Sequence, residues 1–176
     1  MSNSGSRTFK ASSHRSLYER DYYTWALEQA HVLEEKRAQD LDWDNLAEEV
    51  EDLARRDVDS LRNQLARLLA HLLKWQVQPS RRSNSWRASI RGARDQIREL
   101  LDESPGLKSR ISELFKRAYR AGLNLAIEET NLNESRFPAA CPWTFEQATS
   151  EDFWPDSLNR ADQRSGNDSR SNRKRH

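Results

Sequence analysis

Apolar residues recur every three or four positions along most of the chain, a spacing that is typical of amphipathic helices. The first stripe, which includes Tyr18, Tyr22, Trp25 and Leu33, predicts a helix that ends near Gln39. No segment shows the strict apolar–polar alternation of a half-buried strand. The pattern therefore predicts an all-α protein.

A second, longer stripe predicts a helix from about Trp43 to Gln76. Its inward positions are Leu46, Val50, Leu53, Leu61, Leu65, Leu68 and Leu72. Asp42 or Asp44 is the expected N-cap. At 1.5 Å per residue this helix would be about 50 Å long, which is more than one small core requires. We therefore expect a bend or break within residues 57–60.

Two prolines separate the next helices. Pro79 ends the second helix, because proline disfavours helical geometry in the residue before it. A third helix follows, with inward positions Trp86, Ile90, Ala93, Ile97, Leu100 and Leu101. Ser104 and Pro105 predict the start of a fourth helix, as N-cap and first helical residue. Gly122 within that helix predicts a close approach of two helices, since glycine otherwise costs about 1 kcal/mol there.

The C-terminal part is less regular. After Thr130 a loop with prolines leads to a short helix that begins with a capping box of Thr144 and Gln147. The aromatic residues of the 153–155 segment are expected to pack back on the helices. We predict a single all-helical domain over residues 17–155, an antiparallel bundle of four main helices plus a short C-terminal helix. Disordered tails are expected at 1–16 and 156–176, which are polar.

The charge is nearly balanced overall but unevenly distributed. The 176 residues contain 29 Lys and Arg and 28 Asp and Glu, a formal net charge of +1. Residues 18–60 carry 5 positive and 14 negative side chains (−9), whereas residues 61–100 carry 9 and 2 (+7). Such segments can neutralise each other within the fold or present two faces to different partners.

Composition narrows the functional classes. One cysteine cannot form an internal disulfide or a multi-cysteine metal site. The apolar runs fall far short of the roughly 20 residues that span a bilayer, and the N-terminus lacks the apolar region of a signal peptide. The five glycines are too dispersed for a phosphate-binding loop. We therefore expect a cytoplasmic protein with no membrane span, no metal and no cofactor.

Four arginines follow one side of the third helix. Arg87, Arg91, Arg94 and Arg98 are spaced +4, +3 and +4, which confines them to an arc of about 60°. With Arg81, Arg82 and a stacking Trp86 they could contact a nucleic-acid backbone. The favoured interpretation is structural, because arginines beside an apolar seam usually pair with carboxylates across it.

The second helix offers polar partners for those arginines. Asp57, Gln64 and His71 are spaced one heptad apart. If the second and third helices form an antiparallel hairpin, His71 lies near Arg87 and Arg91, and Gln64 lies near Arg94. Asp57 and Arg98 are then the expected ion pair of a semi-buried polar network.

Histidine and cysteine give little support for an enzyme. His14 and His176 fall in the predicted tails, and His31 faces away from its core. A di-iron site needs a Glu-x-x-His motif, but position 68, three residues before His71, is Leu. Cys141 has no neighbour in sequence that would activate a thiol. We name no catalytic residue, and an enzyme centred on His71 is the third hypothesis.

Tryptophan is abundant, with six residues. The favoured interpretation is core packing, because tryptophan fills volume that few other large residues fill here. Trp75 and Trp86 flank the basic turn at Arg81 and Arg82, however. An exposed tryptophan pair at that place would be typical of an interaction site.

Several segments together resemble a known family. They are Leu17–Glu19 with Tyr22–Trp25, Leu41–Glu49, Leu69–Gln76, Ser83–Arg87, Cys141–Thr144 and Glu151–Pro155. In order and spacing they are similar to the bacterial "domain of unknown function 29" family, from about Leu17 to Pro155. The resemblance implies a small all-helical bacterial protein, and it supplies no established activity, cofactor or catalytic residue.

The expected function is therefore binding. We predict a non-catalytic interaction or adaptor protein whose partner, an unknown protein, contacts the basic aromatic turn at Trp75, Arg81, Arg82, Trp86 and Arg87. The alternative is a nucleic-acid-binding protein that uses the arginine-rich third helix and the basic tail. The sequence leaves the oligomeric state open.

Overall fold

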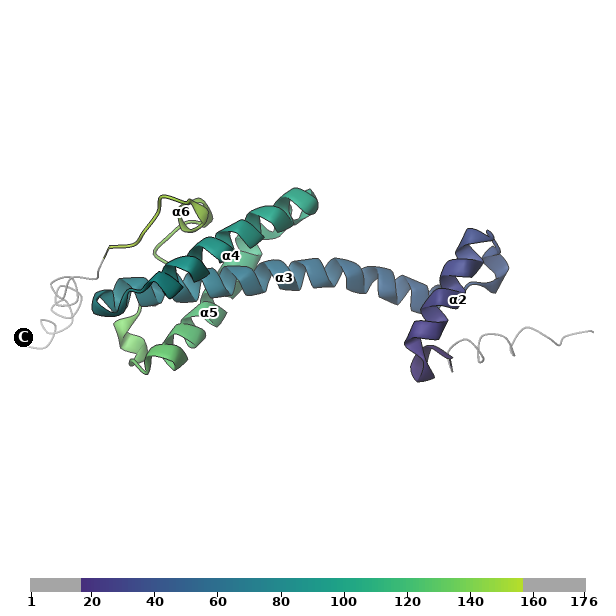
Figure 1. Cartoon of the computed structure of the whole chain (residues 1–176), viewed down its shortest axis with the longest axis horizontal. Coiled ribbons are helices and arrows are strands. Elements are labelled where there is room, and N and C mark those ends of the chain that lie inside the picture. Colours follow the sequence, from purple (N-terminus) through teal and green to yellow (C-terminus); the bar gives the residue numbers. More distant parts are fainter. Residues whose placement is uncertain (1–16, 157–176) are drawn as a thin grey trace, which may run out of the picture. The chain divides into compact units, whose positions relative to one another are not determined.

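The computed structural model describes residues 17–156, which are helical for most of their length (Figure 1). Its main helices are α2 (Tyr22–Glu34), α3 (Trp43–Val77), α4 (Asn84–Glu103), α5 (Ile111–Thr130) and α6 (Phe145–Thr149). Single 3₁₀ segments occur at Ala38–Asp40, Pro79–Arg81, Pro105–Arg110 and Glu134–Arg136. The described part contains no strand, so the predicted all-α class is confirmed. The predicted tails lie outside the described residues, apart from Asp156.

The described residues form two compact units, unit 1 up to Arg56 and unit 2 from Asp57 onward. Helix α3 contributes to both and continues through residues 57–60, so a break there is wrong, whereas a bend stays a prediction. Ion pairs along its exposed sides support the helix near this boundary. Arg55 binds Glu51 at 2.8 Å and Asp52 at 2.9 Å, and Arg62 binds Asp59 at 3.0 Å. The antiparallel four-helix bundle and the single domain over 17–155 stay predictions.

Unit 1 is joined by polar contacts around Asp42. The α2 side chains of Trp25, Gln29 and Val32 are buried. Trp25 Nε1 donates to Asp42 Oδ2 at 3.2 Å, and the Asp42 backbone N–H donates to Gln29 Oε1 at 2.8 Å. Asp42 also accepts from the Asn45 backbone N–H at the start of α3. This contact confirms Asp42 as the N-cap.

A second polar contact of unit 1 involves Glu49. The hydroxyls of Tyr18 and Tyr22 each donate to this carboxylate at 2.7 Å. These hydrogen bonds lower the pKa of Glu49 and raise the pKa of Tyr18 to about 12. Glu49 therefore holds the start of the chain against α3.

Part of the predicted inward stripe of unit 1 is exposed. Tyr22, Leu33, Val50 and Leu53 are 48%, 51%, 64% and 59% exposed. Helix α2 also ends at Glu34, before the predicted Gln39. The periodicity identified apolar helix faces correctly but did not show whether a neighbour covers them.

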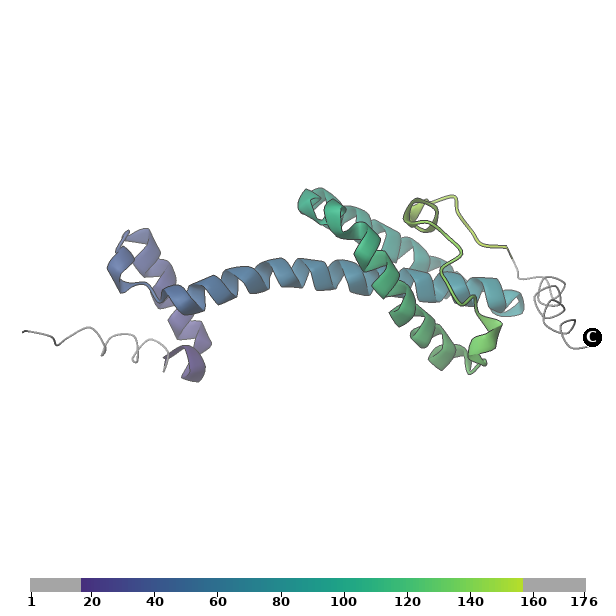
Figure 2. The same ribbon diagram turned by 180° about the vertical axis from the view of Figure 1, so that it is seen from behind.

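The main core lies in unit 2, where α4 and α5 lie along the C-terminal part of α3 (Figure 2). Its buried residues run from Leu61 to Ala148 and include Leu65, Leu68 and Ile97. A Cβ atom at Gly122 would lie 2.6 Å from the Ala66 carbonyl oxygen on α3. Since real contacts do not become that short, glycine is required here, and the predicted close approach is confirmed.

The link from α4 to α5 differs from the expected N-cap. Pro105–Arg110 forms a 3₁₀ segment, and α5 begins only at Ile111. The Ser104 hydroxyl makes no capping hydrogen bond and instead donates to Asp57 Oδ2 at 2.7 Å. Because the residues that follow Ser104 form a 3₁₀ segment, no α-helical first turn begins there for its side-chain oxygen to cap. The capping box of Thr144 and Gln147 on α6 is confirmed.

Candidate functional site

The basic turn between α3 and α4 lies over a tryptophan. Ser83 caps α4 by accepting from the Trp86 backbone N–H at 3.3 Å. Arg82 Nε donates to the Trp75 carbonyl oxygen at 2.9 Å. The Arg82 guanidinium then lies 4.9 Å from the centroid of the Trp75 ring. Arg82 is therefore fixed by both the backbone and the indole of α3.

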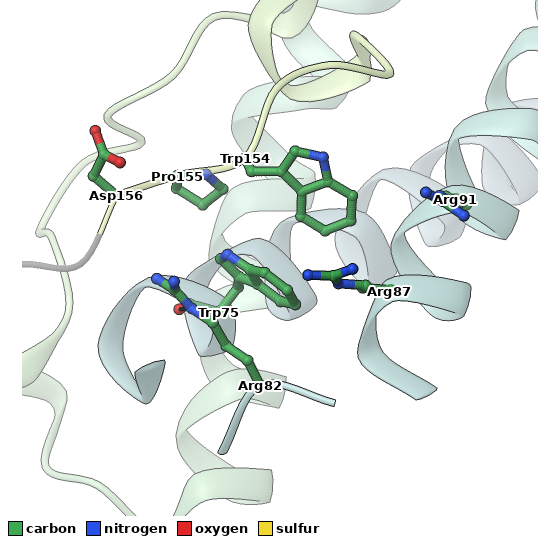
Figure 3. Close-up of a pocket in the computed structure, with 7 residues that line it drawn as sticks. All are labelled: Trp75, Arg82, Arg87, Arg91, Trp154, Pro155 and Asp156. Carbon is green, nitrogen blue, oxygen red and sulfur yellow. Dashed lines mark hydrogen bonds between the residues drawn. The ribbon is translucent and has the colours of Figure 1, made fainter. Parts of the chain in front are cut away.

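A second tryptophan reaches the same place from the C-terminal segment. The Trp75 and Trp154 ring centroids are 4.8 Å apart, with an interplanar angle of 49°. The Arg87 guanidinium lies 5.4 Å from the Trp75 centroid and 5.9 Å from the Trp154 centroid. Figure 3 shows Arg87 pointing toward both indoles from α4. Cation–π attraction to two rings restricts this side chain.

These side chains surround a pocket of about 280 Å³. It is lined by Trp75, Arg82, Arg87, Arg91, Trp154, Pro155 and Asp156 (Figure 3). An adjoining hollow of about 440 Å³ shares three of these residues and adds Ser83 and Asn84. Guanidinium groups held beside aromatic rings suit carboxylate or phosphate groups, which they bind through paired N–H donors. We call this site the Arg–Trp pocket.

Arg94 holds the C-terminal segment beside the Arg–Trp pocket. Its side chain is 2% exposed and donates to the carbonyl oxygens of Ala148, Glu151 and Phe153 at 3.0, 3.2 and 2.6 Å. Its guanidinium also lies 5.4 Å from the Trp154 centroid. Burial lowers the pKa of Arg94. Arg94 was predicted to lie near Gln64 in a polar network, but its Nε, Nη1 and Nη2 atoms donate to backbone carbonyls of the C-terminal segment instead.

The remainder of the predicted polar network is not formed either. Arg98 binds Asp95 at 3.3 Å and Glu151 at 2.6 Å, whereas Asp57 accepts from Ser104. The predicted Asp57–Arg98 ion pair is therefore wrong. Gln64 is partly buried, and its Oε1 atom has no hydrogen-bond partner within residues 17–156.

His71 lies in a different environment from the one expected. Its Nδ1 atom is 2.9 Å from the Arg67 carbonyl oxygen, and burial lowers its pKa. The charged groups that act on it are Lys74, Glu129 and Arg67, rather than Arg87 and Arg91. Lys74 is bound to Glu129. His71 lines neither the Arg–Trp pocket nor the hollow beside it.

The sequence-predicted candidates thus divide into two groups. Trp75, Arg82 and Arg87 meet at the pocket as expected for the turn. Arg81 is exposed in the turn, and Trp86 is partly buried with the Lys74 ammonium 4.6 Å from its ring centroid. Sequence reasoning missed Trp154 as a member of the site. The sequence predicted that the aromatic residues of the 153–155 segment pack on the helices, but it did not predict which residues they contact.

Two further kinds of reactive group are the Cys141 thiol and possible metal ligands. Cys141 is partly buried, and burial raises the pKa of its thiol. Within residues 17–156, no three His, Cys, Asp or Glu side chains are grouped as a metal site requires. No helix in this part of the chain combines the length and apolarity of a membrane span.

Comparison with known proteins identifies the family alone. No curated protein matches the chain, and no solved structure matches it. A family described as "Domain of unknown function DUF29" matches residues 17–154, a range that includes Trp75, Arg87 and Trp154 of the Arg–Trp pocket. The match covers well over half of the sequence, and the chain therefore belongs to the DUF29 family.

Proposed function

We propose that this protein is a non-catalytic interaction or adaptor protein that binds an acidic segment of a partner protein in the Arg–Trp pocket. The observation that carries the proposal is the state of Arg87. Its guanidinium is held by two indoles, yet within residues 17–156 no carboxylate forms an ion pair with it. Arg91, which lines the same pocket, likewise has no ion pair in the described chain. A restricted cation with unused donors is suited to a carboxylate ligand.

The neighbouring arginines support this choice by contrast. Arg94 donates hydrogen bonds to three backbone carbonyls, and Arg98 forms ion pairs with two carboxylates. The described residues therefore provide acceptors for Arg94 and Arg98, whereas none of their carboxylates forms an ion pair with Arg87 or Arg91. We place the protein in the bacterial cytoplasm as part of the same proposal, on the basis of the family resemblance and the single cysteine.

Nucleic acid is the alternative ligand of the same pocket, since guanidiniums also bind phosphates. Single-stranded bases need an open aromatic face to stack on. Trp75 is only 5% exposed, and its ring is already covered by Trp154, Arg82 and Arg87. This burial favours a peptide carboxylate over a stacked base. The enzyme hypothesis rests on His71, which lies outside the pocket.

A binding assay with two anionic probes tests the proposal. A labelled oligoglutamate peptide and single-stranded oligothymidylate of equal formal charge are titrated with the full chain. We expect the peptide to bind more tightly. Arg87→Ala with Arg91→Ala should weaken peptide binding by about tenfold or more, since charge-assisted hydrogen bonds contribute about 1.5–3 kcal/mol each.

The matched control is Arg117→Ala with Arg120→Ala, which removes two exposed charges from α5. This variant should bind the peptide as the wild type does. Tighter binding of oligothymidylate, with a steep loss as salt rises, would instead identify a nucleic-acid-binding protein. Equal effects of both double variants would show that only net charge matters and would overturn the proposed site.

A further inference from the structure

The large hydrophobic side chains that the described chain leaves exposed all belong to unit 1. They are Tyr22, Tyr23, Leu27, Leu33, Trp43, Val50 and Leu53, with exposed fractions of 48% to 73%. Single exposed apolar residues are ordinary, but a contiguous group of them is typical of a binding surface. By their positions on the helices, these residues form one group on α2 and another on α3.

Helix α2 is apolar on two sides. At 100° per residue, its exposed apolar residues span an arc of about 140° from Tyr22 to Leu27. The buried residues Trp25, Gln29 and Val32 lie outside that arc. A helix that is apolar on several sides is normally buried on all of them. One apolar side of α2 is therefore left without cover.

The first part of α3 carries an exposed apolar stripe. Trp43 and Val50 are one heptad apart, and Leu53 follows three residues later. This is the heptad spacing of the apolar residues by which one helix packs on another. Farther along the same helix, the inward leucines Leu61 and Leu65 are 0% exposed, because unit 2 covers them. The stripe of α3 is thus suited to packing against a helix, and no helix within residues 17–156 covers its unit 1 portion.

The charge of unit 1 indicates what kind of helix could bind. Residues 17–56 carry 5 positive and 12 negative side chains, a net charge of −7. Asp44, Glu48 and Glu51 lie about 80–140° from Trp43 by helical spacing, on the side of α3 turned away from Val50 and Leu53, so the negative charge belongs to unit 1 and not to the stripe itself. Two copies of a unit with this net charge repel each other, and an anionic membrane repels it too. A positively charged partner is attracted.

We propose that the exposed apolar stripe of unit 1 binds a basic amphipathic helix of a partner protein. Apolar side chains of the partner would cover Trp43, Val50 and Leu53, and its Lys or Arg side chains would be attracted by the net negative charge of residues 17–56. This surface is separate from the Arg–Trp pocket and stands without it. With both surfaces in use, the chain would join an acidic partner to a basic one.

The test uses two model helices that differ only in charge. One peptide has leucines on one face and lysines on the other, and the second has glutamates in place of the lysines. Each is labelled and titrated with the full chain, with binding followed by fluorescence anisotropy. We expect the Leu/Lys peptide to bind and the Leu/Glu peptide to bind at least tenfold more weakly.

Variants of the stripe locate the binding. Val50→Ser with Leu53→Ser should weaken binding of the Leu/Lys peptide tenfold or more, and Glu48→Gln with Glu51→Gln should reduce its salt dependence. Asn63→Ser with Asn124→Ser, at exposed sites of α3 and α5, is the control and should have no effect. Circular dichroism checks that each variant stays helical, and Trp43→Gln provides an independent test if the serine variant does not.

Three results would overturn the proposal. The first is equal binding of both peptides, and the second is full binding by both the serine variant and Trp43→Gln. The third is a wild-type dimer in analytical ultracentrifugation that the serine variant converts to a monomer, which would identify a second copy as the occupant. The Arg87→Ala, Arg91→Ala variant should keep its affinity for the Leu/Lys peptide, so failure of one proposed surface is distinguishable from failure of the other.

Discussion

The Trp154 indole lies 4.8 Å from the Trp75 indole, measured between ring centroids, although the two residues belong to opposite ends of unit 2 in sequence. Helix α3 supplies one ring and the segment after α6 supplies the other. Arg94 fixes that segment through backbone carbonyls on both sides of its turn. The Arg–Trp pocket therefore exists only when the C-terminal segment is in place.

Trp154→Ala should weaken the binding of oligoglutamate by about tenfold, because Arg87 loses one of its two aromatic neighbours and the pocket loses a wall. A titration of the variant against the labelled peptide measures this. Trp43→Ala is the matched control, since it removes an exposed tryptophan from unit 1. Unchanged peptide affinity in Trp154→Ala would exclude the pocket as the binding site.

Arg94→Ala should lower the free energy of unfolding by about 2–4 kcal/mol, since three backbone carbonyls lose their buried donors. Amide hydrogen exchange should rise in the 145–156 segment. Arg91→Ala, an exposed position in the same helix, should change stability by less than about 0.5 kcal/mol. Urea titrations give both values, and equal stability of the two variants would contradict the role assigned to Arg94.

Two glycine substitutions should have opposite signs. At Gly122 a methyl group would meet the Ala66 carbonyl oxygen at 2.6 Å, so Gly122→Ala should destabilise the protein by about 1–3 kcal/mol. At Gly92, in the interior of α4, nothing lies within 4 Å of the added methyl group. Gly92→Ala should stabilise by about 0.5–1 kcal/mol through helix propensity. Thermal melting of the pair measures the difference, and a stable Gly122→Ala variant would be inconsistent with the close approach.

The sequence predicted those features whose cause is local. Gly122 was identifiable because glycine is costly inside a helix without a packing reason, and the Thr144 capping box depends on residues three positions apart. Ser104 shows the limit of such reasoning. The residues after it form a 3₁₀ segment that it does not cap, and its hydroxyl donates to Asp57, which is distant in sequence.

The candidate site was predicted only in part, and the reason is chemical. A search of the sequence for ion pairs considers only carboxylate partners, whereas the acceptors of Arg94 are backbone carbonyls. Since every residue has a backbone carbonyl, the residue types do not show which ones Arg94 binds. Trp154 was missed because its partner, Trp75, is brought near only by the fold. Helical periodicity likewise identified the apolar stripe at Val50 and Leu53 but carried no information on what covers it.

His71 should make the stability of the protein depend on pH. Burial lowers the pKa of His71 in the folded chain below its ordinary value of 6.5, while the unfolded chain keeps that ordinary value. As the pH falls through 6.5, the unfolded chain binds the proton first, so it is favoured. The free energy of unfolding should therefore rise with pH through this window and fall on acidification.

His71→Gln should remove this pH-dependent component, whereas His31→Gln, at an exposed site of α2, should leave it in place. Urea titrations of the three proteins between about pH 5 and about pH 8 measure the slopes. A wild-type slope that His71→Gln does not change would show that the partly buried His71 imidazole is not the titrating group.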